Sequence, residues 1–405
     1  MGECIGASKG TSLPLVSIIT PSYNTARFIR ATIESVLQQN YPQIEHIVID
    51  GNSTDGTLDI LQEYEGQIQW VSEPDEGQSH ALNKGFRMAR GEIIGWLNAD
   101  DTYNLGAVTA AASFLEAHPE VDMVYSDCYI IDEVGRRTGF LDLPKFDLGR
   151  EVTGNIVAQP TVFIRRYVLE AVGYLNTKLN YVMDYELWLR IGRCFTIQHV
   201  GDTFANFREC EGTKTVSRPE RFWPEVIQVL DRFFEESGLP DHVIRLRPLA
   251  CARAHWMAGL VFHAMDQARL GQKHLEQALR YFDMTSADID FAIDGLVDWA
   301  LRPITRSHLD YAERVLSGVP LPARERTRFR QKTMAHLHIS RAMQMYECND
   351  LEGAWHDLVH GIRSDLTWLR NRGVWSIGIR SVLAQAFLSG RRRASSSEKA
   401  VDAKS

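Results

Sequence analysis

Two neighbouring carboxylates that directly follow an apolar stretch are the residues of this chain best suited to chemistry. Residues 92–97 have the composition of a buried strand, and Asn98, Asp100 and Asp101 come immediately after it. Carboxylates at the carboxyl end of such a strand lie where open α/β sheets bind ligands. Oxygen ligands suit hard divalent cations such as Mg²⁺ or Mn²⁺, which in turn bind phosphate. The pattern therefore predicts a metal-assisted phosphate site, with an acidic turn or helix cap as the alternative.

Further candidate residues follow three earlier strand-like stretches in the same way. They are Pro21, Tyr23 and Asn24 after the first stretch, Asp50 and Asn52 after the second, and Asp75 after the third. Because adjacent parallel strands end side by side, these residues would line one edge of a sheet. A nucleotide base would stack on Tyr23 and donate an N–H group to Asp50. A metal-bound diphosphate would lie against Asp100 and Asp101.

The elements that would position these residues alternate between strand and helix from residue 15 to about residue 195. We expect strands over 16–20, 46–50, 68–71, 92–97 and 123–131, with helices over 26–39, from about 57, and over 78–89. This alternation predicts an α/β fold whose mostly parallel sheet has helices on both faces.

The pattern of the chain changes after about residue 219, where strand-type stretches end and helical spacing takes over. We expect four parts: a disordered N-terminus over 1–13, an α/β domain over 14–221, an all-helical domain over 222–390 and a disordered tail over 391–405. The helical domain contains a faint echo at an offset of 83 residues, in which Gly271 and Leu275 match Ala354 and Leu358. This echo suggests helix hairpins of tetratricopeptide type.

The composition of the chain narrows the classes of protein to which it can belong. The 405 residues are 44% hydrophobic and 24% charged, as in soluble globular proteins, and the net charge of −8 argues against a nucleic-acid binder. The six cysteines form no Cys-x-x-Cys pair, which fits a reducing compartment and argues against zinc. Without a signal-peptide pattern or a spanning apolar stretch, we expect a cytoplasmic protein. Peripheral contact with the inner face of a membrane stays open.

In residues 15–215 the chain resembles family 2 glycosyltransferases of the GT-A fold. The matching stretches are 17–24, 48–57, 75–78, 81–86, 96–101, 159–161, 183–190 and 207–208. The resemblance implies the fold of nucleotide-diphospho-sugar transferases and inverting transfer of a sugar to an acceptor hydroxyl. It favours a uridine diphosphate (UDP) sugar as donor and leaves deoxythymidine and guanosine donors open. It also implies a carbohydrate or lipid-linked acceptor in surface polysaccharide or glycolipid synthesis.

The resemblance also implies roles for single residues. Those that would bind the donor are Pro21, Tyr23, Asn24, Asp50, Asn52, Asp75, Asn98 and Asp100. The triplet 98–100 stands at the family's Asp-x-Asp metal motif, with an amide in place of the first acid. Asp100 would therefore hold the divalent metal, with Asp101 assisting.

Asp184 stands where the resemblance implies the catalytic base, and Glu186 is the fallback candidate. A carboxylate that removes the acceptor's hydroxyl proton typically contributes about 10²–10⁴-fold in rate. A base on the face opposite the leaving group gives single displacement with inversion. Because Asp184 would begin a helix, the helix N-terminus should favour its ionised form.

Two positions depart from the family's pattern. His80 stands where relatives often have an acid, and Cys210 stands where they often have histidine after Phe-Arg. We expect Cys210 to be a weaker partner for metal or diphosphate than histidine. Thr213, Lys214 and Thr215 remain available to meet the phosphates.

The motifs of other enzyme classes built on parallel sheets are absent from this sequence. No Gly-x-Gly-x-x-Gly follows the first strand, which excludes a typical dinucleotide-dependent oxidoreductase, and no Gly-Lys-Ser/Thr marks a P-loop. A nucleotidyltransferase of related fold stays open because it shares the metal–diphosphate chemistry. A non-catalytic scaffold that works through its helical domain also stays open.

The helical domain admits several uses. It could bind a partner protein, support self-association or contribute to an acceptor site. Residues 361–393 carry seven arginines and one acid, which a helix lying on an anionic membrane surface would also show. A terminal helix packed on its own domain is the alternative.

Overall fold

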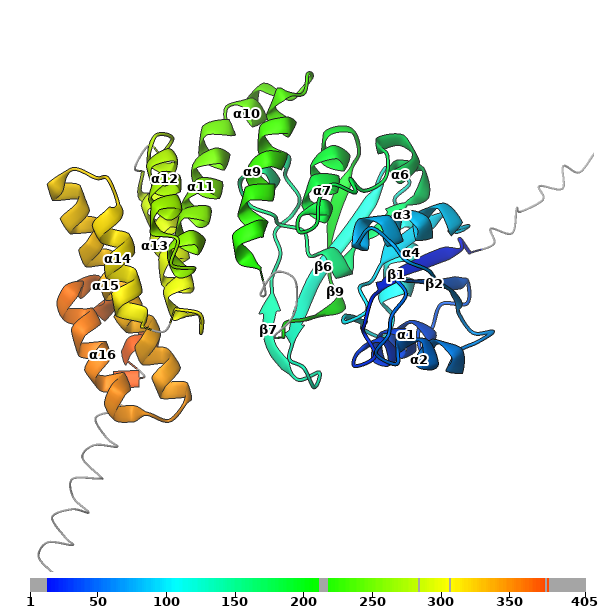
Figure 1. The fold of residues 1–405 in the computed structure, drawn as a ribbon, viewed down its shortest axis with the longest axis horizontal. Coiled ribbons are helices and arrows are strands. Elements are labelled where there is room, and N and C mark those ends of the chain that lie inside the picture. The colour runs from blue at the N-terminus through cyan, green and yellow to red at the C-terminus, as the bar shows by residue number, and fades with distance from the viewer. Residues whose placement is uncertain (1–12, 211–217, 283–284, 306, 376, 379–405) are drawn as a thin grey trace, which may run out of the picture. The chain divides into compact units, whose positions relative to one another are not determined.

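The computed structural model describes residues 13–210, 218–282, 285–305, 307–375 and 377–378 (Figure 1). The chain divides into two compact units, one ending at Ala250 and one beginning at Cys251. The tail 391–405, nearly all of the N-terminal segment 1–13 and the candidate phosphate partners 213–215 lie outside the described residues.

A nine-stranded sheet forms the centre of the first unit, in the order β3-β2-β1-β4-β8-β6-β9-β5 with β7 paired to β6. The strands are β1 Val16–Ser22, β2 Ile44–Asp50, β3 Gln69–Ser72, β4 Ile93–Trp96, β5 Thr102–Tyr103, β6 Met123–Ile131, β7 Arg137–Leu141, β8 Phe163–Arg165 and β9 Ile197–Arg208. The helices described in this unit are α1 Ile29–Leu37, α2 Thr57–Glu63, α3 Gln78–Met88, α4 Ala107–Ala117, α5 Leu148–Thr153, α6 Arg166–Val172, α7 Met183–Cys194, α9 Pro219–Glu235 and α10 Asp241–Ile244, with the 3₁₀ helix η1 Gln159–Thr161.

The α/β class is confirmed, and the sheet is more mixed than we expected. Among the described strands, four neighbouring pairs are parallel and four are antiparallel. The parallel pairs β3-β2, β2-β1 and β1-β4 form the half that carries the predicted donor residues. The antiparallel pairs involve β5, β7 and β8, which are only two to five residues long and show little periodicity in the sequence.

The parallel register brings the predicted strand ends to one edge. All seven residues of β1 are buried, as the β-branched side chains of a doubly covered strand require. Ser22 lies opposite Asp50, and Asp50 lies opposite Ser72, so β1, β2 and β3 end level with one another. Ile19 lies opposite Trp96, which places the end of β4 at the same edge.

Helices cover both faces of this parallel half. Ile18 belongs to an apolar cluster with residues of α1 and α4, and Val48 packs with residues of α1 and α2. Ile19 and Ile49 point to the opposite face, where Gly85 of α3 lies against them. The alternation of side chains along each strand therefore separates two helical layers.

The helices α9 and α10 belong to the first unit, so the structural boundary lies later than residue 221. Glu225 of α9 accepts hydrogen bonds from the backbone that precedes α7. Arg193 of α7 pairs with Glu236, which follows α9. Helical spacing alone cannot reveal such contacts, which is why the sequence placed 222–250 with the helical domain.

The second unit is helical throughout its described residues and begins within α11. Its helices are α11 Arg247–Ala264, α12 Ala268–Leu279, α13 Ser286–Leu301, α14 His308–Gly318, α15 Ala323–Glu347 and α16 Leu351–Ser364, followed by the 3₁₀ helix η2 Leu366–Arg370. Among the described residues, no helix is both long enough and apolar enough to cross a bilayer.

Three consecutive helix pairs of this unit share one packing pattern. Equivalent buried positions recur 41 or 42 residues apart: Gly259, Ala300 and Ala342 on the first helix, Gly271, Ala312 and Ala354 on the second, and Leu275, Leu316 and Leu358 one turn later. A Cβ added at Gly259 would lie 2.7 Å from Leu275 and 3.2 Å from the carbonyl oxygen of Gly271. Small residues thus let the paired helices approach closely, and the echo at 83 residues spans two such steps.

We predict that Gly85→Ala destabilises the first unit. The added methyl would overlap the Ile19 side chain of β1, and such overpacking costs typically about 1–3 kcal/mol. Chemical denaturation should show the loss. Gly201→Ala is the matched control, because no atom lies within 4 Å of a Cβ added at Gly201. Denaturation curves that coincide for Gly85→Ala and the wild type would contradict this packing.

Candidate active site

The loops after β1 and β2 are tied to each other by polar contacts. The Asn24 N–H donates to Ser53 Oγ at 2.7 Å, and Asn24 Oδ1 accepts from the Thr54 N–H at 2.9 Å. Asn24 and Asn52 have φ angles of 52° and 64°, a region that asparagine tolerates better than most residues. Such backbone conformations cluster at ligand-binding sites. The two loops therefore form one ordered rim beside the strand ends.

Gly51 forms the floor between Tyr23 and Asp75, two of the predicted donor residues. A Cβ at Gly51 would lie 2.7 Å from Asp75 Oδ2 and 3.3 Å from Tyr23 Cδ2, so a larger residue would displace the Asp75 carboxylate. Tyr23 is 64% exposed. Asp75 Oδ1 accepts from the Gly77 N–H at 2.7 Å. The arrangement offers an open aromatic face and a carboxylate to a planar ligand.

Asp50 lies beneath this rim and is fully buried. Its Oδ1 accepts from Ser53 Oγ at 2.5 Å, and its Oδ2 accepts from Ser53 N at 2.9 Å and Ser72 Oγ at 2.7 Å. Three of the roughly four acceptor sites of this carboxylate are thus occupied from within the protein. Pro21 is also buried, within β1, whereas Asn52 is exposed on the rim.

Asn98, at the first position of the metal motif, is fully engaged by neighbouring side chains. Its Nδ2 donates to Gln159 Oε1 at 2.7 Å, and its Oδ1 accepts from Gln78 Nε2 at 2.8 Å and Trp96 Nε1 at 2.9 Å. A carboxylate here could not donate to Gln159. The amide therefore connects α3, β4 and η1, and the carboxylates that follow remain for a cation.

Asp101 and Arg208 link the end of β4 to the end of β9. Asp101 Oδ1 accepts from the Arg208 N–H at 2.8 Å, and Arg208 Nε donates to the Asp100 carbonyl at 2.8 Å. Among the described residues, Asp101 Oδ2 has no hydrogen-bond partner, although Asp101 is only 1% exposed. Burial, and then the charge of Asp100, raise the pKa of Asp101 well above its usual value. A cation at this oxygen would satisfy it.

Asp184 lies in the first turn of α7 and is half-buried. Burial raises its pKa to about 6, although the N–H groups of Tyr185 and Asp184 act in the opposite direction. We expected the helix N-terminus to dominate, and desolvation outweighs it here. One turn later, the Trp188 ring lies 6.3 Å from the Trp96 ring, which packs the start of α7 against β4.

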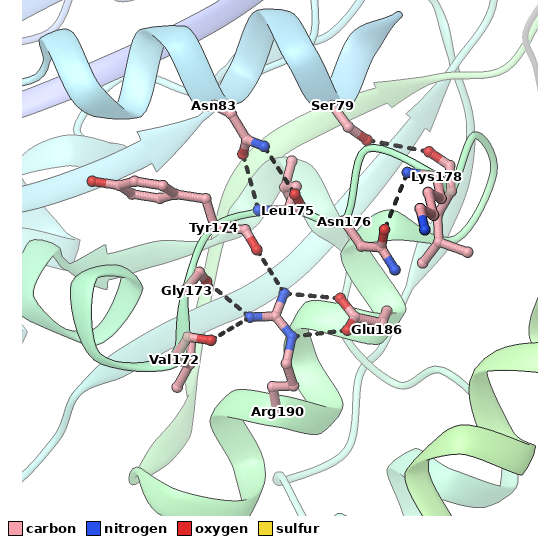
Figure 2. A network of polar contacts seen from close by, with 11 residues as sticks. Ser79, Asn83, Val172, Gly173, Tyr174, Leu175, Asn176, Lys178, Glu186 and Arg190 are labelled. Atoms are coloured by element: carbon pink, nitrogen blue, oxygen red, sulfur yellow. Dashed lines mark hydrogen bonds and ion pairs between the residues drawn. The ribbon is translucent and has the colours of Figure 1, made fainter.

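Glu186, the fallback base, is committed to an ion pair with Arg190 (Figure 2). Its two oxygens accept from Arg190 Nε at 2.9 Å and Nη2 at 2.8 Å. The same guanidinium donates to the carbonyls of Val172, Gly173 and Tyr174 at 2.8, 2.8 and 2.9 Å. The pair therefore fixes the end of α6 and the turn after it.

The segment between this turn and Asp184 is also bound to α3, as Figure 2 shows. Asn83 Nδ2 donates to the Leu175 carbonyl at 2.8 Å, and Asn83 Oδ1 accepts from the Leu175 N–H at 2.9 Å. Ser79 Oγ donates to the Leu179 carbonyl at 3.3 Å. Contacts from α3 thus fix the backbone on the approach to Asp184.

Glu225 of α9 completes the support of this segment. Its Oε2 accepts from the Asn180 N–H at 3.0 Å and from the Tyr181 N–H at 2.8 Å. Asn180 Oδ1 would lie 3.8 Å from a Cβ at Gly77, next to the Asp75 loop. The approach to Asp184 therefore lies beside the donor rim.

Sequence reasoning assigned no role to several residues on which this geometry depends. Gln159, Arg190 and Arg208 stand within the family-like stretches, but their partners lie far away in the sequence. Glu225 fell in the range expected for the helical domain. The sequence does not reveal these contacts, because the partners of Gln159, Arg208 and Glu225 lie 44 to 108 residues away. Arg190 pairs with the nearby Glu186 and also bonds to carbonyls 16 to 18 residues away.

The two departures from the family's pattern both lie near the site. Burial is the main cause that raises the pKa of the Cys210 thiol, and the charge of Asp100 adds to it. A neutral thiol is a weak partner for metal or phosphate. His80 is half-buried on α3, and its Nδ1 has no hydrogen-bond partner among the described residues.

Comparison with known proteins gives a family match in the first half of the chain and relatives that match about half of it. The family model described as "Glycosyl transferase family 2" matches residues 17–172. A PGL/p-HBAD biosynthesis glycosyltransferase of Mycobacterium tuberculosis is 30% identical over 188 residues, which are 45% of this chain and 70% of that protein. An uncharacterized glycosyltransferase of Rickettsia typhi is 30% identical over 201 residues, 47% of this chain and 62% of that protein. Another, of Rickettsia felis, is 28% identical over 217 residues, 50% of this chain and 36% of that protein. The match thus spans less than two thirds of either rickettsial relative.

Solved structures show only a general likeness. S. aureus TarS 1–349 in complex with UDP-GlcNAc has a TM-score of 0.48 at 18% identity, covering 86% of this chain and 91% of that one. The mannosyltransferase PcManGT of Pyrobaculum calidifontis, in complex with GDP-Man and Mn²⁺, has a TM-score of 0.49 at 20% identity, covering 76% and 86%. With TM-scores of 0.48 and 0.49, these structures support no inference about the ligands or activity of this chain.

The mycobacterial relative is matched over more than two thirds of its length, and the family match covers β1 to β4 with the loops that follow them. This chain belongs to glycosyl transferase family 2.

Proposed function

We propose that this protein is an inverting glycosyltransferase that moves a sugar from a nucleotide diphosphate sugar to an acceptor hydroxyl. The observation that carries the proposal is the edge of the parallel sheet in a member of this family. Tyr23 and Asp75 flank a glycine floor there, and Asp100 and Asp101 follow the neighbouring β4. Asp184 begins the helix that packs against β4.

The donor side favours a nucleotide with a planar base. The exposed Tyr23 ring provides a stacking face, and Asp75 provides an acceptor for a base N–H group. Asn24 and Asn52 keep the rim in its shape, while Asp50 holds the loop from below. We propose UDP as the nucleotide, on the family resemblance, and deoxythymidine or guanosine donors are the alternatives.

A divalent cation, Mg²⁺ or Mn²⁺, fits the end of β4. The unpartnered Asp101 Oδ2 and the adjacent Asp100 offer the hard oxygen ligands that such cations prefer. No group of three or more His, Cys, Asp or Glu side chains suited to a metal occurs among the described residues, so diphosphate or water would supply the other ligands. When bound, the cation would neutralise charge that develops on the leaving diphosphate.

Asp184 is the proposed base. A pKa of about 6 leaves its carboxylate ionised at neutral pH, yet makes it a stronger base than an ordinary aspartate. Glu186 has both oxygens in the ion pair with Arg190, which favours Asp184 over it. The segment fixed by Asn83 and Glu225 would then keep Asp184 in place while an acceptor hydroxyl approaches.

The proposed acceptor rests only on the chain's relatives and on the family resemblance. One relative is named for PGL/p-HBAD biosynthesis, and the family resemblance points to surface polysaccharide or glycolipid synthesis. We therefore propose a carbohydrate or lipid-linked acceptor, met in the cytoplasm or at the inner face of the membrane. The helical unit, with its repeated helix pairs, is the proposed site of a protein partner or of self-association.

We predict that Asp184→Asn lowers kcat by about 10²-fold or more while donor affinity stays nearly unchanged. The substitution keeps the shape of the side chain and removes its basicity. The wild-type kcat should fall as the pH drops below about 6, because Asp184 becomes protonated there. Donor-turnover assays across pH, with calorimetry for the nucleotide, would measure both quantities.

Glu186→Gln is the matched comparison. It should weaken the ion pair with Arg190 and lower stability without removing the acid limb of the pH profile. If Asp184→Asn keeps near-full kcat while Glu186→Gln does not, the base is Glu186. If both keep it, single displacement is the wrong mechanism.

We predict that Asp100→Ala abolishes metal-dependent turnover and weakens Mn²⁺ binding. Removing one carboxylate leaves Asp101 as the remaining acid at the end of β4 to hold a doubly charged ion. Paramagnetic resonance of Mn²⁺ gives a readout independent of turnover. Glu116→Ala, an exposed acid on α4, is the control. Full turnover of the wild type in excess chelator would refute metal dependence.

A further inference from the structure

A closed ring of hydrogen bonds lies at the end of β4, directly before the candidate metal carboxylates. Trp96 Nε1 donates to Asn98 Oδ1 at 2.9 Å, and Asn98 Nδ2 donates to Gln159 Oε1 at 2.7 Å. Gln159 Nε2 donates in turn to the Trp96 carbonyl at 2.7 Å. The ring therefore begins and ends on one residue of β4. Gln159 is buried within η1, and the proposed reaction gives it no part.

Trp96 fixes the direction of every bond in this ring. Its indole N–H can only donate, so the Asn98 oxygen must face it and the Asn98 NH₂ group must face Gln159. Its backbone carbonyl can only accept, so the Gln159 NH₂ group must face it and the Gln159 oxygen must face Asn98. The two ends of the ring thus give the same assignment, and an amide at each of positions 98 and 159 satisfies it.

A carboxylate at position 98 could not close the ring. One of its oxygens would replace the Asn98 nitrogen, which lies 2.7 Å from the Gln159 oxygen, and two acceptors would then face each other. Flipping the Gln159 amide would give no relief, because its oxygen would then face the Trp96 carbonyl. The acid of the family's metal motif is therefore incompatible at this position with glutamine at position 159.

The ring lies between the parts of the candidate site. Asn98 Oδ1 also accepts from Gln78 Nε2 at 2.8 Å, at the start of α3. The Trp96 indole, which Asn98 holds, lies 6.3 Å from the Trp188 ring, one turn after Asp184 in α7. η1 itself packs against β4 and β9, the two strands whose ends are joined at the candidate metal site.

We propose that Gln159 is a positioning residue for the carboxylates of Asp100 and Asp101, and that it acts only with an amide at position 98. The chain would hold its cation with one acid fewer than the family's motif offers, on a strand end that the ring fixes. This inference rests on the proposed cation at the end of β4. It predicts that an acid added at position 98 weakens cation binding, whereas its charge alone would strengthen it.

Paramagnetic resonance of Mn²⁺ separates these two effects. Asn98→Asp should raise the dissociation constant of Mn²⁺ by about tenfold or more, as the loss of support behind metal ligands typically does. Gln159→Met has a side chain of similar length without the two hydrogen bonds, and it should weaken Mn²⁺ binding in the same way. Tighter or unchanged binding by Asn98→Asp overturns the proposal, and so does unchanged binding by Gln159→Met.

Two controls exclude simpler causes. Asn40→Asp adds the same charge where an acid can keep the existing bond, because the Asn40 oxygen accepts from Thr109 Oγ at 2.8 Å. Val108→Ala removes buried apolar volume from α4 and should lower stability without touching the ring. Both should bind Mn²⁺ as the wild type does. If Val108→Ala loses Mn²⁺ affinity as the ring variants do, lost stability explains the effect and the proposal falls.

A double-mutant cycle tests the ring with neither metal nor substrate. In urea denaturation, Asn98→Asp should raise the unfolding constant by about tenfold or more in the wild type. It should raise that constant much less in the Gln159→Met background, where no acceptor faces the new acid. An equal effect in both backgrounds overturns the ring.

The two experiments together distinguish failure of this inference from failure of the proposed function. A wild type that binds no Mn²⁺ refutes the proposed cation, and the positioning role falls with it even if the cycle shows the ring. A wild type that binds Mn²⁺ while both ring variants bind it equally well refutes the positioning role alone.

Discussion

The removal of carboxyl groups from water is the constraint on which the first unit depends. Several acids of this unit are wholly or partly desolvated, among them Asp50, Asp101, Glu151 and Asp184, and each must find donors, stay protonated or await a cation. Asp50 finds donors in Ser53 and Ser72. Asp101 finds one in the backbone of Arg208 and, among the described residues, keeps one oxygen unpartnered. These different solutions place an acid bonded within the protein, the proposed metal ligand and the proposed base at one sheet edge and its flanking helix.

The placement of these acids depends on residues that bond to other parts of the protein. Asn98 joins α3, β4 and η1 through its amide. Arg190 and Glu225 fix the backbone on either side of the segment that leads to Asp184. Such support would limit the motion of Asp184 in its proposed role as base, and restricted motion is how positioned general bases gain their effect. The candidate site therefore includes these supporting residues as well as the carboxyl side chains.

Much of the parallel half was predictable because its strands are buried on both faces and therefore strongly apolar. Parallel neighbouring strands end at the same edge of a sheet, which is why Asp50 and Asp100 were expected there. The register of β1 with β2 came from the structure. The antiparallel strands β5, β7 and β8 were not predictable, because two to five residues give little periodicity. The boundary between the two units was also missed. The helical spacing of α9 gives no sign that Glu225 accepts a hydrogen bond from the Tyr181 N–H, in the segment that leads to Asp184.

The sequence by itself determined the family, the parallel strands, the order of the site motifs and the identity of the candidate acids. Those features depend on local composition and spacing, which are the same in the unfolded chain. Only the tertiary structure decided which acids are ionised and which are already bonded. Glu186 is taken by Arg190, and the Asn98 amide at the start of the metal motif donates to Gln159. Burial raises the pKa of Asp184 against the pull of its helix. Desolvation and long-range partners set these properties, and neither exists until distant segments pack together.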